Sequence, residues 1–220
     1  MGLNPPYLLL HHVALRPMTS HAHNLASLIG SRICHDLISP IGAIHNGIEL
    51  LMLGQTKDVP DEEMSLNFDS RRHAESKVKF FRLAFGQNTA DPQISRTKAE
   101  VILQDYLSIY RITLDWKLSG SASLNYIQAL FTSALCLQAG LPRGGHISVE
   151  QFGEAHLIKG SGPSILQDEL PWDLLAQSDL TSAVKLDNVA FALLPEFVAK
   201  VNLNIDITLA DTSIEIALRP

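Results

Sequence analysis

The sequence predicts an α+β protein in two parts: an antiparallel helical hairpin that forms a four-helix bundle by dimerisation, and a small α/β sandwich after it. Two long runs with helical periodicity fill the first part of the 220-residue chain. The turn-forming segment GQNTADP, residues 86–92, then interrupts the helical pattern. Beyond it, helical runs mix with short runs that alternate as strands do. This length suits one large domain or two small ones, and the break at residues 86–92 favours two.

The hairpin is expected over residues 21–54 and 61–85, joined by the turn GQTKDVP. Gly54 ends the first helix, Pro60 introduces the second, and three acidic residues then suit the positive end of that helix. Two antiparallel helices cannot surround a core alone, so each must bury its apolar stripe against something else. Self-pairing into a four-helix dimer is the simplest solution.

The second part has a mixed pattern. Helices are expected over residues 98–116, 123–139 and 187–201, and strands over residues 146–152, 155–159, 203–209 and 214–218. The predicted organisation is therefore an N-terminal segment at 1–20, a helical hairpin at 21–88, and an α/β domain at 92–220.

Composition and charge exclude several classes of protein. With 17 basic against 23 acidic residues the net charge is -6, which makes nucleic acid a poor partner. Cys34 and Cys136 form neither a disulfide framework nor a zinc pattern, as expected for a reducing cytosol. The longest apolar run has six residues, far short of the roughly 20 that span a bilayer. We expect a soluble, cytoplasmic protein with no membrane partner.

His35 lies on the polar side of the first helix. At about 100° per residue, the apolar residues of this helix fall within a stripe of roughly 80°. The stripe comprises Ile33, Leu37, Pro40, Ile44, Ile48 and Leu51. His35 lies about 200° from Ile33, with Ser39, Gly42 and Asn46 on its own face. The imidazole is expected to point outward, just before a kink at Pro40.

An exposed imidazole beside a carboxylate can act as a nucleophile. Asp36 can hold the Nδ1 proton of His35, which leaves Nε2 free to attack near neutral pH. A phosphoryl group is one electrophile it could accept. The simpler alternative is an ordinary surface histidine.

The local string CHDLISPIGAI, residues 34–44, resembles the phosphoacceptor box of bacterial sensor histidine kinases. In that box a His is followed by an acidic residue, a Leu, a Ser, Thr or Asn, and a Pro. The chain departs from the pattern at Ile38, where the kinases usually have a basic or polar residue. The match lies on the first of two long helices, as the dimerisation and phosphotransfer domain of these kinases requires.

The second part resembles the kinase ATP-binding domain, of the Bergerat type, in a degenerate form. The string LPRGG at 141–145 anchors the alignment, which puts the two asparagines of the family's magnesium-binding box on Thr132 and Cys136. A thiol is a poor substitute for an oxygen ligand of Mg²⁺. No glycine follows Gly162, so the glycine-bearing nucleotide lid is missing as well.

Together these features are similar to the ChpT-type histidine phosphotransferases of alphaproteobacterial phosphorelays. The resemblance covers residues 21–220 and includes RLAFG at 82–86, which closes the second helix. It implies that His35, aided by Asp36, accepts a phosphoryl group from a receiver aspartate of a hybrid histidine kinase. His35 then passes the group to a receiver aspartate of a response regulator. It implies a homodimer with no cofactor and no metal of its own, because Mg²⁺ belongs to the receiver.

The receiver is expected to dock around His35, on Arg32, Ser39, Gly42 and Asn46. The second helix carries five cations that either meet an acidic receiver or form a solvated face paired with Asp69 and Glu75: Arg71, Arg72, Lys77, Lys79 and Arg82. Two other functions stay open. One is an ATP-dependent histidine kinase, and the other is a dimeric receiver-binding scaffold without catalysis.

Overall fold

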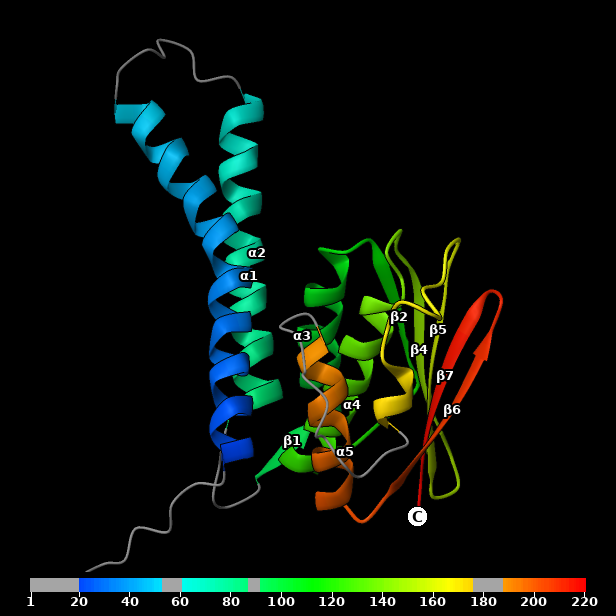
Figure 1. Ribbon diagram of the computed structural model, residues 1–220. Helices are drawn as coiled ribbons and strands as arrows, with labels where there is room; N and C mark the ends of the chain where they lie inside the picture. The colour runs from blue at the N-terminus through cyan, green and yellow to red at the C-terminus, as the bar shows by residue number, and fades with distance from the viewer. Residues whose placement is uncertain (1–19, 53–60, 87–91, 176–187) are drawn as a thin grey trace, which may run out of the picture.

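The computed structural model describes residues 20–52, 61–86, 92–175 and 188–220. Helices α1 (Ser20–Met52) and α2 (Asp61–Phe85) form the antiparallel hairpin, which projects beyond the rest of the chain (Figure 1). Both predicted long helices are confirmed within two residues at each end. The predicted segment 1–20 lies almost entirely outside the described residues.

A five-stranded sheet forms the far side of the second part, in the order β2-β4-β5-β7-β6. Its strands are β2 (Ile112–Trp116), β4 (Gly145–Phe152), β5 (Ala155–Ser161), β6 (Asn204–Ala210) and β7 (Ser213–Arg219). β2 pairs with β4 in parallel, and every other neighbour in the sheet is antiparallel. Both predicted hairpins, β4–β5 and β6–β7, are confirmed.

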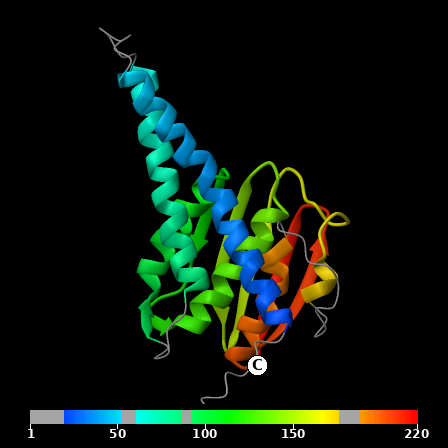
Figure 2. The ribbon, with the colours of Figure 1, turned by 60° about the vertical axis from the view of Figure 1, so that its left-hand side comes forward.

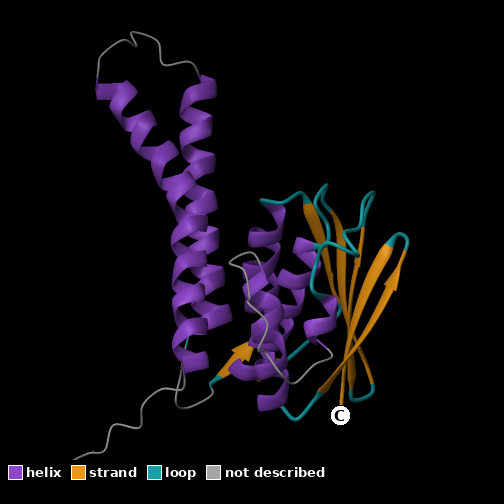
Figure 3. Cartoon of the chain, viewed as in Figure 1, coloured by secondary structure: helices purple, strands orange, loops and turns teal. Residues whose placement is uncertain are grey.

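Helices cover one face of this sheet (Figure 3). They are α3 (Arg96–Ser108), α4 (Leu124–Ala139) and α5 (Val189–Lys200), with the 3-10 turn η1 (Trp172–Leu175) beside them. Strands β1 (Gln93–Ser95) and β3 (Ser121–Ser123), which the sequence analysis missed, form a separate two-stranded ribbon. Alternate strand residues such as Ile147 and Val149 are fully buried against the helices, which produces a two-layer sandwich.

The predicted helix over residues 98–116 is wrong in its second half. Helix α3 ends at Ser108, and Arg111 then adopts a left-handed backbone conformation with φ 59°. The chain continues as the strand β2, which contains the β-branched residues Ile112 and Thr113. No glycine or proline marks this break, because an ordinary residue takes the left-handed position.

Close backbone contacts explain why LPRGG ends in two glycines. Gly144 has φ 79°, and a Cβ built on it would lie 2.5 Å from the carbonyl oxygen of Arg111. Gly145 donates its backbone N–H to that same oxygen at 3.1 Å. These contacts join the start of β4 to the start of β2, so any side chain at Gly144 would push the two strands apart.

One part of the hairpin packs directly on the second part of the chain (Figure 2). Phe80, Phe81 and Ala84 of α2 are buried in the same core as α3 and α4. The ring of Phe80 stacks on Tyr106 of α3, with 3.8 Å between centroids, and on Phe131 of α4, with 5.1 Å. The apolar surface of the hairpin is therefore covered in part by its own chain, a partner that the periodicity did not identify.

Candidate functional site

His35 presents its imidazole to solvent on α1. The side chain is 69% exposed, and its Nδ1 lies 3.3 Å from Oδ1 of Asp36. An ionised carboxylate only accepts hydrogen bonds, so this contact places the proton on Nδ1 and leaves Nε2 with a free lone pair. The predicted outward direction of His35 is confirmed.

The carboxyl group of Asp36 is turned inward rather than toward solvent. Its side chain is only 8% exposed, and the guanidinium Nε of Arg32 donates to its Oδ2 at 3.0 Å. Arg32 lies one helical turn before Asp36 and is itself 18% exposed. Burial alone would lower the pKa of Arg32, but the charge of Asp36, with smaller contributions from two tyrosines, raises this pKa overall. The ion pair is therefore partly buried and well formed.

Pro40 leaves one backbone acceptor of α1 without its helical partner. The N–H of residue 40 would bond the carbonyl of residue 36, four positions earlier, but proline has no N–H. In the structure the ammonium of Lys77, on α2, donates to that carbonyl oxygen of Asp36 at 2.9 Å. Helix α1 leans away from α2 toward its C-terminal end (Figure 1), as expected for a helix with an internal proline.

Two tyrosines lie beside this contact, Tyr106 on α3 and Tyr110 in the turn directly after that helix. The ammonium of Lys77 is 5.9 Å from the ring centroid of Tyr110, and the hydroxyl of Tyr106 donates to the hydroxyl of Tyr110 at 3.4 Å. Burial raises the pKa of Tyr106 and of Tyr110. Burial also lowers the pKa of Lys77, an effect that Asp36 partly offsets. The His35 site thus rests on residues of α1, α2 and α3.

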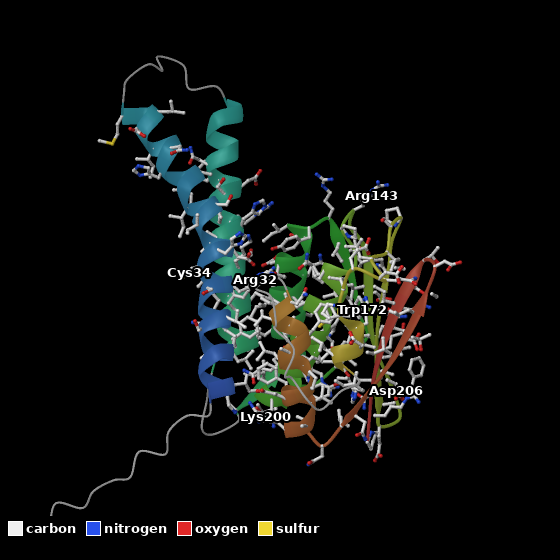
Figure 4. All side chains as sticks on the ribbon, in the orientation of Figure 1. Arg32, Cys34, Arg143, Trp172, Lys200 and Asp206 are labelled. Carbon is white, nitrogen blue, oxygen red and sulfur yellow. The ribbon has the colours of Figure 1, made fainter. Side chains whose placement is uncertain are left out.

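The residues expected to contact a partner differ in their setting. Ser39 and Asn46 are exposed, and Gly42 faces open space, where an added Cβ would meet nothing within 4 Å. Arg32 turns to Asp36 instead and is largely covered. Arg32 and Cys34 both lie on the part of α1 that runs beside the second part of the chain (Figure 4). The docking role of all four residues stays a prediction.

Four of the five cations of α2 divide into two groups, and the fifth, Arg82, is exposed near the end of the helix. Arg71 and Lys79 both pair with Glu75, at 3.5 and 2.7 Å. Arg72 pairs with Asp69 at 3.5 Å. These exposed pairs match the alternative of a solvated, self-paired face. Lys77 belongs to neither alternative, because it points into the hairpin, and no local pattern in the sequence distinguishes it from its neighbours.

The residues at the expected magnesium-binding positions are engaged inside α4. Thr132 is fully buried, and its hydroxyl donates to the carbonyl of Gln128 at 2.7 Å. Cys136 is also fully buried, and burial raises the pKa of its thiol well above the ordinary value. Neither side chain offers an oxygen ligand toward solvent, so these two residues do not fit a nucleotide-bound Mg²⁺.

Metal-ligand clusters and membrane-spanning helices are both absent from the described residues. No group of three or more His, Cys, Asp and Glu side chains there is arranged to hold a metal ion. Among the same residues, none of the helices combines the length and the apolar character that crossing a membrane requires.

Known proteins are similar to this chain in both sequence and structure. Residues 96–213 match the family model of the histidine phosphotransferase C-terminal domain. The protein phosphotransferase ChpT of Brucella abortus (strain 2308) is 36% identical over 141 residues, which are 62% of this chain. The match spans 65% of that relative's length.

Solved structures resemble this chain as well. One, described as a bacterial phosphotransferase, superposes with a TM-score of 0.76 and 26% identity, and covers 92% of this chain and 99% of that one. The histidine kinase AdeS of Acinetobacter baumannii superposes more loosely, with a TM-score of 0.40 and 12% identity over 84% of this chain and 95% of that one. With a family model that matches more than half of its residues, the chain belongs to the histidine phosphotransferase family.

Proposed function

We propose that this protein is a phosphorelay histidine phosphotransferase that uses His35 as its phosphoacceptor. The observation that carries the proposal is the exposed imidazole whose Nδ1 faces the Asp36 carboxylate, within a chain of the histidine phosphotransferase family. The donor is the receiver aspartate of a hybrid histidine kinase, and the acceptor is the receiver aspartate of a response regulator. We expect this exchange to take place in the cytoplasm.

The chemistry of the transfer follows from the site. The Nε2 lone pair of His35 attacks the phosphorus of the receiver's aspartyl phosphate, an N–P bond forms, and the acyl O–P bond breaks. The receiver aspartate leaves as a carboxylate with the bonding electron pair. The imidazole gains positive charge, which the adjacent Asp36 carboxylate stabilises through the Nδ1 proton. Transfer onward to a second receiver reverses these steps, and the receiver supplies the Mg²⁺ each time.

In this function His35 takes no phosphoryl group from ATP bound by its own chain. Thr132 bonds a backbone carbonyl inside α4 and Cys136 is fully buried, which supports this part of the proposal. An ATP-dependent kinase would take label from ATP without any receiver. A silent scaffold would bind receivers and take no label at all.

The proposed active form is a homodimer. A second apolar stripe of α1 is exposed, with Ile38 at 71%, and falls within about 80° of the helix. This stripe, which we call the α1 seam, comprises Ile38, Ile41, Ile48 and Met52. Its spacing of three and seven residues is typical of helices that pack in a bundle, and Phe68 and Val78 are exposed on α2 as well. A second copy of the hairpin is the occupant that fits such a seam.

Radioactive phosphoryl transfer tests the function. The purified protein and its His35→Ala variant are incubated with ATP alone, then with a phosphorylated receiver domain of a hybrid kinase. We expect acid-labile label from the receiver only, and complete loss of label in the variant. Label from ATP alone would show a kinase, and a wild-type protein that binds the receiver without taking label would show a scaffold.

A further inference from the structure

The carboxylate that faces His35 is held from behind by contacts outside the phosphoacceptor box. Asp36 neighbours His35 in sequence, but consecutive helical residues point about 100° apart, so helix geometry alone does not bring their side chains together. Something must fix the Asp36 backbone and carboxyl group for the Nδ1 contact to persist. The structure shows one contact at each end of this residue: Arg32 at the carboxylate and Lys77 at the carbonyl.

The Lys77 contact occurs where the helix is weakest. Pro40 removes the only backbone donor that the carbonyl of Asp36 would have in a regular helix. A carbonyl near a partly buried carboxylate needs a replacement donor, and an ammonium provides a charge-assisted one at 2.9 Å. Because this donor comes from α2, it also ties the kinked segment of α1 to the other helix of the hairpin.

The position of Lys77 depends on Tyr110, in the turn directly after α3. Its ammonium lies over the ring of Tyr110, whose hydroxyl accepts from the buried Tyr106. Tyr106 is stacked on Phe80, three residues after Lys77 on α2. A lysine has many rotamers in water, and the aromatic ring restricts it to those that reach the Asp36 carbonyl.

We propose that Lys77 and Tyr110 are positioning residues for phosphoryl transfer at His35. Lys77 binds the Asp36 carbonyl that Pro40 leaves free, and Tyr110, in the turn directly after α3, confines Lys77, so that Asp36 keeps the proton of His35 on Nδ1. The second part of the chain thereby sets the tautomer of the phosphoacceptor without touching it. This inference rests on the proposed function for its kinetic consequence, but the tautomer itself is a property of the protein alone.

Nitrogen-15 NMR of the imidazole groups tests the tautomer without any receiver. The His35 signals are identified by their absence in His35→Ala. We expect neutral His35 to carry its proton on Nδ1 in the wild type and in Lys77→Arg, and to shift toward the Nε2–H form in Lys77→Met. Lys159→Met, at an exposed position of β5 far along the chain, is the matched control and keeps the wild-type tautomer. An unchanged tautomer in Lys77→Met would overturn the inference even if the wild type accepted no phosphoryl group.

Transfer kinetics separate positioning from docking. We expect Lys77→Met to lower the maximal rate of phosphoryl transfer from a receiver about tenfold, with the half-saturating receiver concentration unchanged. Lys77→Arg should recover most of the rate, and Lys159→Met should transfer as the wild type does. A higher half-saturating concentration with an unchanged maximal rate would mean that Lys77 contacts the receiver, which would overturn the positioning role.

A double-mutant cycle tests the link to Tyr110. Tyr110→Leu removes the ring beside Lys77 and should slow transfer in the same way, by less than Lys77→Met. The double variant should be no slower than Lys77→Met alone, because both changes act through one contact. Fully multiplicative losses would overturn the role of Tyr110. Circular dichroism and thermal unfolding identify any variant whose loss of rate reflects a loss of fold.

Discussion

At the scale of single residues, a buried polar side chain lies outside the proposed site. His156 on β5 is only 7% exposed, and neither of its ring nitrogens has a hydrogen-bond partner in the described part of the chain. Its ring packs edge-on against the ring of Tyr126, with 4.8 Å between centroids. The guanidinium of Arg96 lies over the Tyr126 ring, 5.4 Å from its centroid. Burial, with a smaller contribution from Arg96, lowers the pKa of His156 to about 4.

This histidine predicts a pH-dependent stability. The unfolded chain binds a proton at His156 near its ordinary pKa of about 6.5, whereas the folded chain does so only near pH 4. The free energy of unfolding is therefore highest, as far as His156 is concerned, above pH 6.5. It falls by up to about 3 kcal/mol as pH falls from 6.5 to 4. Urea unfolding of the wild type and of His156→Leu at several pH values measures this difference.

The contribution of His156 appears as a difference between the two curves. The free energy of unfolding of the wild type should fall relative to the variant over that interval and stay level below pH 4. Other titrating groups act on both proteins equally. Parallel curves would show that the buried ring gains its proton without cost, contrary to this account.

At the scale of residues, the sequence was a good guide only where the partner is local. The outward direction of His35 and its Asp36 neighbour follow from the helical wheel. The sequence did not distinguish Lys77 from the other four cations of the second helix. Its partner is 41 residues away and is a backbone carbonyl rather than a side chain. The absence of an N–H at Pro40 was visible in the sequence and was the only available indication that Asp36 needs another donor.

At the scale of elements, the face of α1 around His35 offers a sharp test of docking. A methyl group at Gly42 meets no atom of this chain, and the same holds at Gly30, on another face about 140° from His35. Each glycine-to-alanine change should raise helix stability by up to about 1 kcal/mol. The two variants therefore differ only in where a partner would meet the new methyl group.

Gly42→Ala should weaken receiver binding while the protein itself becomes more stable. A methyl group forced into a close interface costs about 1.4 kcal/mol or more, so the half-saturating receiver concentration should rise about tenfold. Gly30→Ala should leave that concentration unchanged. Transfer titrations with a phosphorylated receiver measure both, and equal behaviour of the two variants would remove Gly42 from the docking surface.

Long elements with clear periodicity were predictable, and short ones were not. The helices of the hairpin and the four strands β4 to β7 follow from patterns within each segment. Strand β2 was read as part of a helix because Arg111 makes the break with a left-handed backbone that only the parallel pairing with β4 requires. Strands β1 and β3, of three residues each, are too short to show a period.

At the scale of the whole molecule, the hairpin has two apolar surfaces. One is covered by α3, α4 and α5 of the same chain, and the α1 seam is exposed. The sequence predicted the first stripe with Ile48 in it, but in the structure Ile48 is 50% exposed and lies at the edge that this stripe shares with the α1 seam. Ile38, which departs from the kinase pattern, lies on this seam, where the proposed dimer would bury it.

Charges on the seam should separate the two protomers. Ile41→Glu combined with Ile48→Glu would place four carboxylates in the apolar interface of the proposed dimer, which should convert it to a 24.2 kDa monomer. Sedimentation equilibrium at several concentrations measures the mass. Leu50→Glu, an exposed apolar position on another side of α1, is the matched control and should remain dimeric. A wild-type protein that sediments as a monomer would remove the dimer from the proposal.

The contact between Lys77 and the carbonyl that Pro40 exposes also has an evolutionary consequence. Without the proline, the backbone N–H of residue 40 would compete with the half-buried ammonium of Lys77 for the Asp36 carbonyl. Without the lysine, that carbonyl would lose the donor that replaces the missing N–H. Neither substitution is neutral alone, so drift at one position should be followed by change at the other. Among relatives of this chain, we expect the two positions to vary together, although 37 residues separate them.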